Sequence, residues 1–290
     1  MPSPVPVRRI AVWSVIPLII ALLATTLSAT TPARAGERNL VIFGDSVPAD
    51  PPLESYAPEL LGLLATGSSA DGQERESCTR SPESFGVLAA QELGLTAHDF
   101  SCAGSAATSP GFLSIGLSFP QQINLALEAD ALGPRTERVL ITVGFNDTYT
   151  NLGLTRAQLR EEFVAAALPQ IERIQAAAPE ARIQIVGYGS ITEEGHVCLV
   201  HLGNNSHDRT PTRLVTGLEG VSQQMQQDLA EAADIEFLDL KPSTADNSTC
   251  APDDQRMWAG LIDRQAGPNN LPVHANARGH AHIADVIVTS

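Results

Sequence analysis

Short apolar runs that stop at glycine limit the folds open to this chain more than any other feature. Three such runs, Asn39–Phe43, Arg138–Val143 and Arg182–Val186, each end directly before a glycine, and Ile235–Leu238 is a fourth apolar run. Each run is short and rich in β-branched residues. That pattern is typical of a parallel strand that is covered on both faces.

Stretches with helical spacing of apolar residues lie between and after these runs. The spacing predicts helices over Pro82–Leu93, Thr155–Ala178, Thr212–Ala233 and about Ala277–Ile287. Strands that alternate with helices favour a parallel sheet with helices on both faces. The predicted class is therefore α/β, a three-layer sandwich with a central, mostly parallel sheet.

The first 35 residues have the pattern of a signal peptide. Arg8 and Arg9 precede an apolar run from Ile10 to about Leu27, and Ala33-Arg34-Ala35 matches a cleavage site. An uncleaved membrane anchor is the alternative, although the run is interrupted by Pro17 and is marginal for spanning a bilayer. We expect cleavage near Ala35, a secreted protein, and a single domain over residues 36–290.

The charge balance excludes one class of partner. The chain has 18 lysines and arginines against 33 aspartates and glutamates, a net charge of −15. Nucleic-acid binding needs clustered basic side chains, so we expect no nucleic-acid partner.

Export makes disulfides plausible for the four cysteines. Three pairings are possible, and we expect the sequential one, Cys78–Cys102 and Cys198–Cys250. The absence of C-x-x-C spacing argues against a zinc ribbon or a redox motif. The histidines from His196 to His207 and the acidic residues from Asp239 to Asp254 lack regular ligand spacing, so we expect no metal site.

Four short blocks carry a more specific signal. They are Phe43-Gly44-Asp45-Ser46, the segment 99–104 (DFSCAG), Gly144-Phe145-Asn146-Asp147 and the segment 273–280 (VHANARGH). In this order they resemble the blocks of the GDSL, or SGNH, hydrolase superfamily, of the secreted bacterial esterase and lipase type. The resemblance spans residues 43 to 280 and implies the flavodoxin-like SGNH hydrolase fold.

The resemblance implies a role for each block. Ser46 would be the nucleophile and His274 the base that accepts its proton, because a serine hydroxyl is a poor nucleophile without a base. The backbone N–H groups of Ser46 and Gly104 and the side-chain amide of Asn146 would stabilise the oxyanion. His280 would instead lie on the last helix, packed and hydrogen-bonded.

The sequence departs from its relatives beside His274. Most relatives have an aspartate three residues before this histidine, where this chain has Leu271. We therefore expect a Ser–His dyad in which a backbone carbonyl, that of Leu271 being the natural candidate, accepts from the histidine ring. Asp263 is the alternative, if the intervening loop folds back. A second departure is Phe145, where secreted relatives commonly have glycine; it either narrows the acyl pocket or faces the core.

The leading function is a secreted esterase or lipase that hydrolyses small-molecule or lipid acyl esters through an acyl-enzyme on Ser46. We expect a monomer without a cofactor, which contacts membrane only through an uncleaved signal segment. Two alternatives stay open: a carbohydrate or cell-wall acetylesterase, and an inactive SGNH-fold binding protein. Aromatic residues are only 4% of the chain, which speaks against sugar stacking.

Overall fold

The computed structural model describes residues 37–66, 78–108, 116–267 and 269–290. Residues 37–290 form one compact unit. The predicted signal peptide and its cleavage site near Ala35 lie outside the described residues. No helix in the described ranges is long and apolar enough to cross a membrane.

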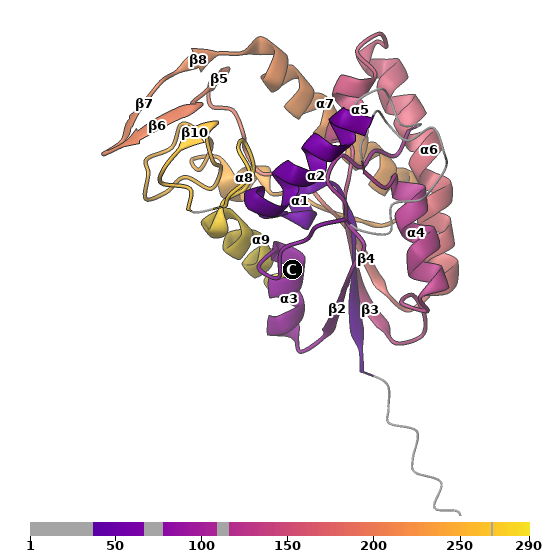
Figure 1. The fold of residues 1–290 in the computed structure, drawn as a ribbon. Helices are drawn as coiled ribbons and strands as arrows, with labels where there is room; N and C mark the ends of the chain where they lie inside the picture. Colours follow the sequence, from indigo (N-terminus) through magenta and orange to yellow (C-terminus); the bar gives the residue numbers. More distant parts are fainter. Residues whose placement is uncertain (1–36, 67–77, 109–115, 268) are drawn as a thin grey trace, which may run out of the picture. The chain divides into compact units, whose positions relative to one another are not determined.

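A five-stranded, wholly parallel sheet forms the centre of the protein, with the strand order β2-β1-β3-β4-β9 (Figure 1). Its strands are β1 (Asn39–Gly44), β2 (Thr96–Asp99), β3 (Thr136–Thr142), β4 (Arg182–Val186) and β9 (Glu236–Leu238). The four predicted strands are confirmed. Strand β2 was not predicted, because this half-buried edge strand has a mixed polar sequence and no apolar run.

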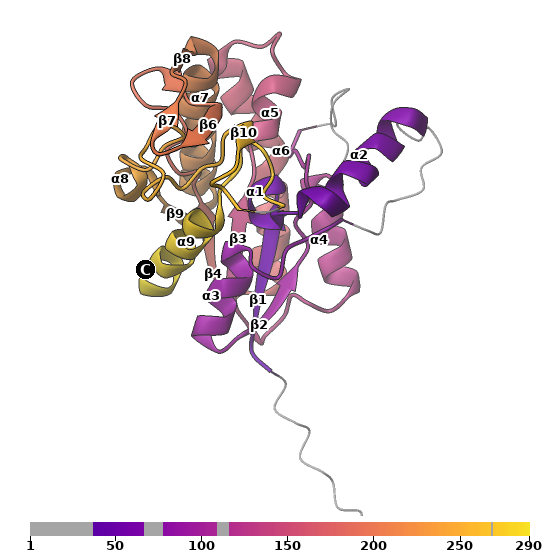
Figure 2. The same cartoon turned by 60° about the vertical axis from the view of Figure 1, so that its left-hand side comes forward.

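Helices cover both faces of the sheet, which confirms the predicted three-layer sandwich. Val41 and Phe43 of β1 pack into one core with three helices, and Leu40 and Ile42 pack into a second core with two others. This alternation is the period of two expected of a strand that is buried on both sides. The helices of the first core are α4 (Phe119–Glu128), α6 (Arg156–Ala177) and α7 (Arg213–Ala233). Those of the second are α3 (Phe85–Leu93) and α9 (Ala277–Thr289) (Figures 1 and 2).

Shorter elements surround the carboxyl edge of the sheet. They include three short helices, α1 (Ser46–Ala49), α5 (Phe145–Thr150) and α8 (Lys241–Thr244). A further helix, α2 (Leu53–Thr66), is longer and follows α1. Two small sheets lie outside the central one: β10-β6-β7 and β5-β8. Their strands are β5 (His196–Val197), β6 (Val200–Gly203), β7 (Ser206–His207), β8 (Thr210–Pro211) and β10 (Ile262–Asp263).

The structure contains both expected disulfides, Cys78–Cys102 and Cys198–Cys250. Cys102 follows β2 and precedes Gly104 by two residues, so the first disulfide ties down the segment that carries one predicted oxyanion donor. The second joins the loop before β6 to the loop after α8.

The carboxyl ends of parallel strands meet at one edge of the sheet, where α/β proteins commonly bind ligands. Here β1 leads directly into α1 with Ser46, and β3 leads into α5 with Asn146. Strand β2 leads towards Gly104. The topology therefore gathers three of the sequence blocks at one edge.

Candidate active site

Ser46 occupies a tight turn between β1 and α1. A side chain at Gly44 would place its Cβ 2.1 Å from the carbonyl oxygen of Thr142, and the φ angle of Gly44 is 145°, so only glycine suits this position. Asp45 is the N-cap of α1, and its carboxylate accepts a hydrogen bond from the backbone N–H of Val47 (2.9 Å). This turn presents the half-buried Ser46 to a cavity.

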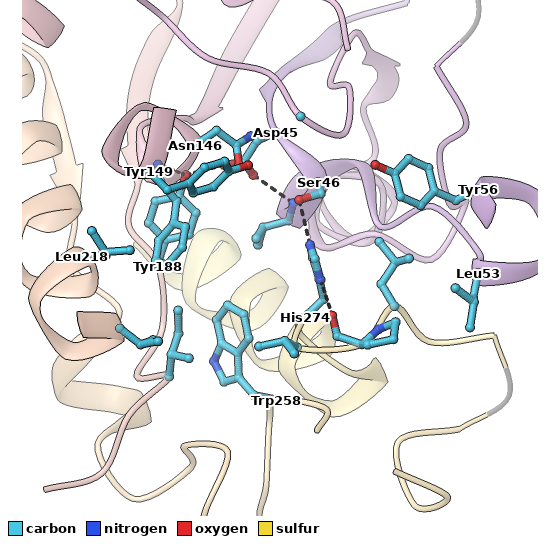
Figure 3. Close-up of a pocket in the computed structure, with 18 of the residues that line it drawn as sticks. Asp45, Ser46, Leu53, Tyr56, Asn146, Tyr149, Tyr188, Leu218, Trp258 and His274 are labelled. Carbon is cyan, nitrogen blue, oxygen red and sulfur yellow. Dashed lines mark hydrogen bonds between the residues drawn. The ribbon is translucent and has the colours of Figure 1, made fainter. Parts of the chain in front are cut away.

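His274 contacts Ser46 directly. The distance from His274 Nε2 to Ser46 Oγ is 2.7 Å, and His274 Nδ1 lies 2.9 Å from the carbonyl oxygen of Pro272 (Figure 3). A carbonyl only accepts, so Nδ1 carries the ring hydrogen and Nε2 is left to accept from the serine hydroxyl. Burial lowers the pKa of His274 from 6.5, and the hydrogen bond to Pro272 opposes this in part. The imidazole is therefore neutral at neutral pH, as a general base must be.

The carbonyl beside the ring is that of Pro272, not that of Leu271 as the sequence suggested. Val273, between Pro272 and the histidine, has a φ angle of 61°, in the left-handed region. This turn brings the carbonyl two residues back against the imidazole. The Leu271 carbonyl instead accepts from the side-chain amide of Asn270 (2.8 Å).

Asp263 does not reach His274. Its carboxylate accepts from the guanidinium of Arg256 (2.8 Å) and from the backbone N–H of Gly260 (2.9 Å), and its side chain is 2% exposed. Asp263 binds the backbone at Gly260, and the neighbouring residue Ala259 in turn holds the backbone of His274. The Ala259 N–H donates to the His274 carbonyl (2.8 Å). Asp263 is thus connected to His274 through backbone hydrogen bonds and not through a direct contact of its carboxylate.

His280 lies on α9, one helix turn past its start, and is buried. Its Nδ1 accepts from the backbone N–H of Phe85 (3.2 Å), and its Nε2 lies 3.3 Å from the carboxylate of Asp50. Its ring also stacks on that of Phe85, with the centroids 6.0 Å apart. The geometry places His274, and not His280, beside Ser46.

Asn146 and Gly104 face the same cavity as Ser46. Asn146 is buried, and its Nδ2 donates to the Ser105 carbonyl (2.7 Å), while its Oδ1 accepts from the Tyr149 hydroxyl (2.6 Å). Gly104 has a φ angle of 83°. The residues predicted as oxyanion donors therefore line one cavity, together with His274.

Comparison with known proteins identifies the family of this chain. The sequence model of the GDSL-like Lipase/Acylhydrolase family matches residues 42–282. This chain belongs to that family. No curated protein matches it in a sequence comparison.

Solved structures share the fold of this GDSL-like acylhydrolase. Phospholipase A1 from Streptomyces albidoflavus is 14% identical, with a TM-score of 0.53, over 87% of this chain and 98% of that chain. The extracellular lipase from Streptomyces rimosus is 19% identical, with a TM-score of 0.53, over 87% of this chain and 97% of that chain. The likeness confirms the SGNH hydrolase fold.

Two buried side chains of this GDSL-like acylhydrolase brace the site and were not singled out from the sequence. The Asp147 carboxylate accepts from the backbone N–H groups of Ala107 (3.1 Å) and Thr108 (2.8 Å), so it holds the segment after Gly104. Gln122 of α4 binds both backbone groups of Gly44 (2.9 and 2.8 Å) and the Ser105 hydroxyl (2.8 Å). Asp147 directly follows Asn146 in its block, whereas nothing in the sequence distinguishes Gln122 from surface glutamines.

A third unpredicted group is Tyr188, which follows β4. Its hydroxyl donates to the Asp45 carboxylate (2.5 Å) and accepts from the backbone N–H of Phe145 (3.1 Å). Burial raises the pKa of Asp45 to about 7, although the hydrogen bonds from Tyr188 and Val47 lower it in part. Burial and the nearby Asp45 raise the pKa of Tyr188 well above 10.0. Tyr188 thereby links the Ser46 turn to the Asn146 block.

The cavity beside Ser46 has a volume of about 560 Å³ and is mostly apolar. All three tyrosines of the chain line it, and so does Trp258 (Figure 3). Among the described residues, no lysine or arginine lines it. Other side chains in its wall are Leu53, Ile191, Val215, Leu218 and Leu271.

Phe145 lies at both of the places considered from the sequence. It lines this cavity, and it also packs against the second core. Its ring meets that of Tyr188 edge to face, with the centroids 5.6 Å apart.

Three histidines, His196, His201 and His207, lie in the segment between β4 and α7. His201 is buried and its Nε2 lies 3.1 Å from the Cys198 carbonyl. Within the described part of the chain, no group of three His, Cys, Asp or Glu side chains is arranged to hold a metal ion.

Proposed function

We propose that this acylhydrolase is a serine esterase that cleaves neutral carboxylic esters with an apolar acyl group through an acyl-enzyme on Ser46. The observation that carries the proposal is the 2.7 Å contact between Ser46 Oγ and His274 Nε2 in an apolar cavity. Membership of an acylhydrolase family supports ester hydrolysis as the reaction class.

The first step forms the acyl-enzyme. Ser46 Oγ bonds to the ester carbonyl carbon while His274 Nε2 takes the hydroxyl proton. The negative charge moves to the carbonyl oxygen, where the N–H groups of Ser46 and Gly104 and the Asn146 amide donate. The tetrahedral intermediate then collapses, the bond to the alcohol oxygen breaks, and the Nε2 proton passes to that oxygen.

The second step repeats this chemistry with water. His274 takes a proton from water while the water oxygen bonds to the acyl carbon. The bond from the acyl carbon to Ser46 Oγ then breaks, the carboxylic acid leaves, and the proton passes from His274 to Ser46 Oγ. Throughout, the Pro272 carbonyl keeps the Nδ1 hydrogen in place. A neutral carbonyl fixes the ring as a carboxylate would, but it stabilises the imidazolium less.

The shape and chemistry of the cavity support an apolar acyl group. Among the residues that the structure describes, the wall offers aliphatic and aromatic side chains and no lysine or arginine that would pair with a charged substrate. Burial of methylene groups there contributes about 0.8 kcal/mol each.

A carbohydrate acetylesterase is the second candidate, and one observation favours it. Aromatic residues are scarce in the chain, but Tyr56, Tyr149, Tyr188 and Trp258 all line this cavity, and the partly exposed rings of Tyr56 and Tyr149 could stack on a sugar. The low aromatic content therefore does not argue against sugar binding in the way that composition alone suggested.

A chain-length series of p-nitrophenyl esters, run beside an acetylated oligosaccharide, tests the substrate. We expect kcat/KM to rise from acetate to medium chains of about six to ten carbons. A maximum at acetate with faster release from the oligosaccharide would favour the second candidate, and no turnover of any ester would favour a binding protein.

Ser46→Ala tests the nucleophile. We expect loss of at least 1,000-fold in kcat with an unchanged melting temperature, and a phosphonate ester that labels the wild type on Ser46 alone. The chain offers a matched control: Ser243 lies 2.9 Å from His282 Nε2 but is exposed and outside the cavity. Ser243→Ala should keep full activity, and labelling of Ser243 in place of Ser46 would contradict the assignment.

We further propose that the enzyme is exported and cleaved near Ala35. The two disulfides and the signal-like segment support this. Amino-terminal sequencing of the exported protein should begin at or near Gly36, and an intact amino terminus in the membrane fraction would contradict it.

A further inference from the structure

We propose that Tyr149 is a positioning residue, whose hydroxyl holds the Asn146 carboxamide so that its nitrogen faces the oxyanion. The inference rests on the proposed role of Asn146 as an oxyanion donor. Tyr149 lies three residues after Asn146 on α5, which puts both on one face of the helix, and Figure 3 shows the two side chains together beside Ser46.

The carboxamide is held at both ends. Asn146 Nδ2 donates to the Ser105 carbonyl at 2.7 Å, and Asn146 Oδ1 accepts from the Tyr149 hydroxyl at 2.6 Å. Ser105 offers a carbonyl, which can only accept, so it selects the nitrogen end. A tyrosine hydroxyl can donate or accept, and with the nitrogen end held by Ser105 the Tyr149 hydroxyl donates to the oxygen end.

This orientation decides what the oxyanion meets. Nδ2 has two hydrogens, and the bond to Ser105 uses one, which leaves the other for a substrate oxygen. A flipped carboxamide would set Oδ1 against the Ser105 carbonyl and against the developing negative charge. Both contacts would be repulsive, so the flip removes a donor from the site and adds an acceptor to it.

The Tyr149 hydroxyl stays a donor under assay conditions. Burial raises its pKa to about 12, and the negative charge of Asp45 adds to this. Asn146 is 7% exposed, so little water is present to replace the bond from Tyr149.

The expected loss of kcat in Tyr149→Phe follows from the contribution of one oxyanion donor and of one hydrogen bond. Loss of an oxyanion-hole donor costs about 100- to 1,000-fold in kcat. Tyr149→Phe keeps Asn146 and its bond to Ser105 but removes one of the two bonds that orient the amide. A neutral hydrogen bond is worth about a 2- to 13-fold factor at 25 °C, so we expect kcat to fall by about that factor, with KM changed less than twofold.

A double-mutant cycle on a p-nitrophenyl ester tests the inference. The variants are Tyr149→Phe, Asn146→Ala and the pair together. If Tyr149 acts through Asn146, the double variant should have the kcat of Asn146→Ala alone. Thr150→Val is the matched control, because Thr150 bonds the backbone carbonyl of Asn146 (2.9 Å) and not its carboxamide; kcat should stay within twofold of wild type.

The outcomes separate the inference from the proposed function. If Asn146→Ala keeps full kcat, the oxyanion role of Asn146 is wrong. If Asn146→Ala loses activity but Tyr149→Phe keeps it, only the inference is overturned. The inference is also overturned if the kcat loss of the double variant equals the product of the two single losses, because Tyr149 then acts independently of Asn146. A raised KM at constant kcat in Tyr149→Phe would likewise overturn it, because Tyr149 would then contact the substrate.

Discussion

Replacing Gln122 by methionine should test how strongly the buried network supports the Ser46 turn. Gln122 is fully buried, and its side chain binds the N–H and the carbonyl of Gly44, the Ser105 hydroxyl and the Leu117 carbonyl. Methionine has nearly the same volume and length, so the substitution removes hydrogen bonds without opening a large cavity.

The magnitude follows from these four contacts. The Gly44 N–H loses its glutamine acceptor inside the protein, and a buried donor without a partner costs about 1–3 kcal/mol. Nε2 has two hydrogens for its three acceptors, so at most two of these bonds are made at full strength, at about 0.5–1.5 kcal/mol each. We therefore expect Gln122→Met to lower the free energy of unfolding by about 2–6 kcal/mol. Because Gly44 and Ser105 adjoin Ser46 and the Asn146 amide, we also expect kcat to fall roughly 10- to 100-fold, as small displacements of reacting groups do.

Urea unfolding followed by fluorescence, and kcat measured on the folded variant, check both numbers. Gln175→Met is the matched control, since Gln175 is half-buried and its amide makes one bond, to the Ala233 carbonyl (3.0 Å). The control should cost about 1 kcal/mol and leave kcat unchanged. Equal losses in the two variants, or a loss under 1 kcal/mol in Gln122→Met, would refute the reasoning.

Three further predictions concern charge. The pKa of His274 is lowered from 6.5, so the imidazole stays neutral below pH 6.5. We therefore expect kcat/KM to fall on the acid side with an apparent pKa below 6.5. An apparent pKa above 7 would contradict this and would indicate a carboxylate partner. Asp263→Asn should lower the free energy of unfolding by about 3 kcal/mol, because Arg256 loses a buried partner. It should keep kcat within a few-fold of wild type. A loss of orders of magnitude in kcat at unchanged stability would instead show that Asp263 is the third member of a triad. Since folding raises the pKa of Asp45 from 3.8 to about 7, folded wild type binds more protons than the unfolded chain in that interval and loses stability as pH rises. Asp45→Asn lacks this dependence, so its stability relative to wild type should increase from pH 4 to pH 7, and a constant difference would contradict the raised pKa.

The sequence alone was enough to predict a central parallel sheet and four of its five strands. Strands β1, β3 and β4 are mostly buried, so each contains a run of predominantly apolar residues, and local composition reveals them. Gly44 was recognised from the sequence only as the end of an apolar run and part of the first block; its need for glycine, the close approach to Thr142, came from the structure. Edge strand β2 escaped notice because half-burial places no such demand on its residues.

The partner of His274 could not be located from sequence to a single residue. Residue 271 is leucine, so the sequence itself shows that no carboxylate stands where most relatives have one. The choice of Pro272 over Leu271 depends on the left-handed conformation of Val273, which a β-branched residue rarely adopts and which the surrounding contacts impose.

The remaining decisions belong to tertiary structure because they join residues far apart in the chain. Gln122 reaches Gly44 across 78 residues, and Tyr188 reaches Asp45 across 143. Composition counts three tyrosines but does not say that all three line one cavity. A residue's type and its local neighbours determine which elements form and which groups can react. Only the packing of those elements decides which groups lie within hydrogen-bonding distance, and the site of this acylhydrolase is made of such contacts.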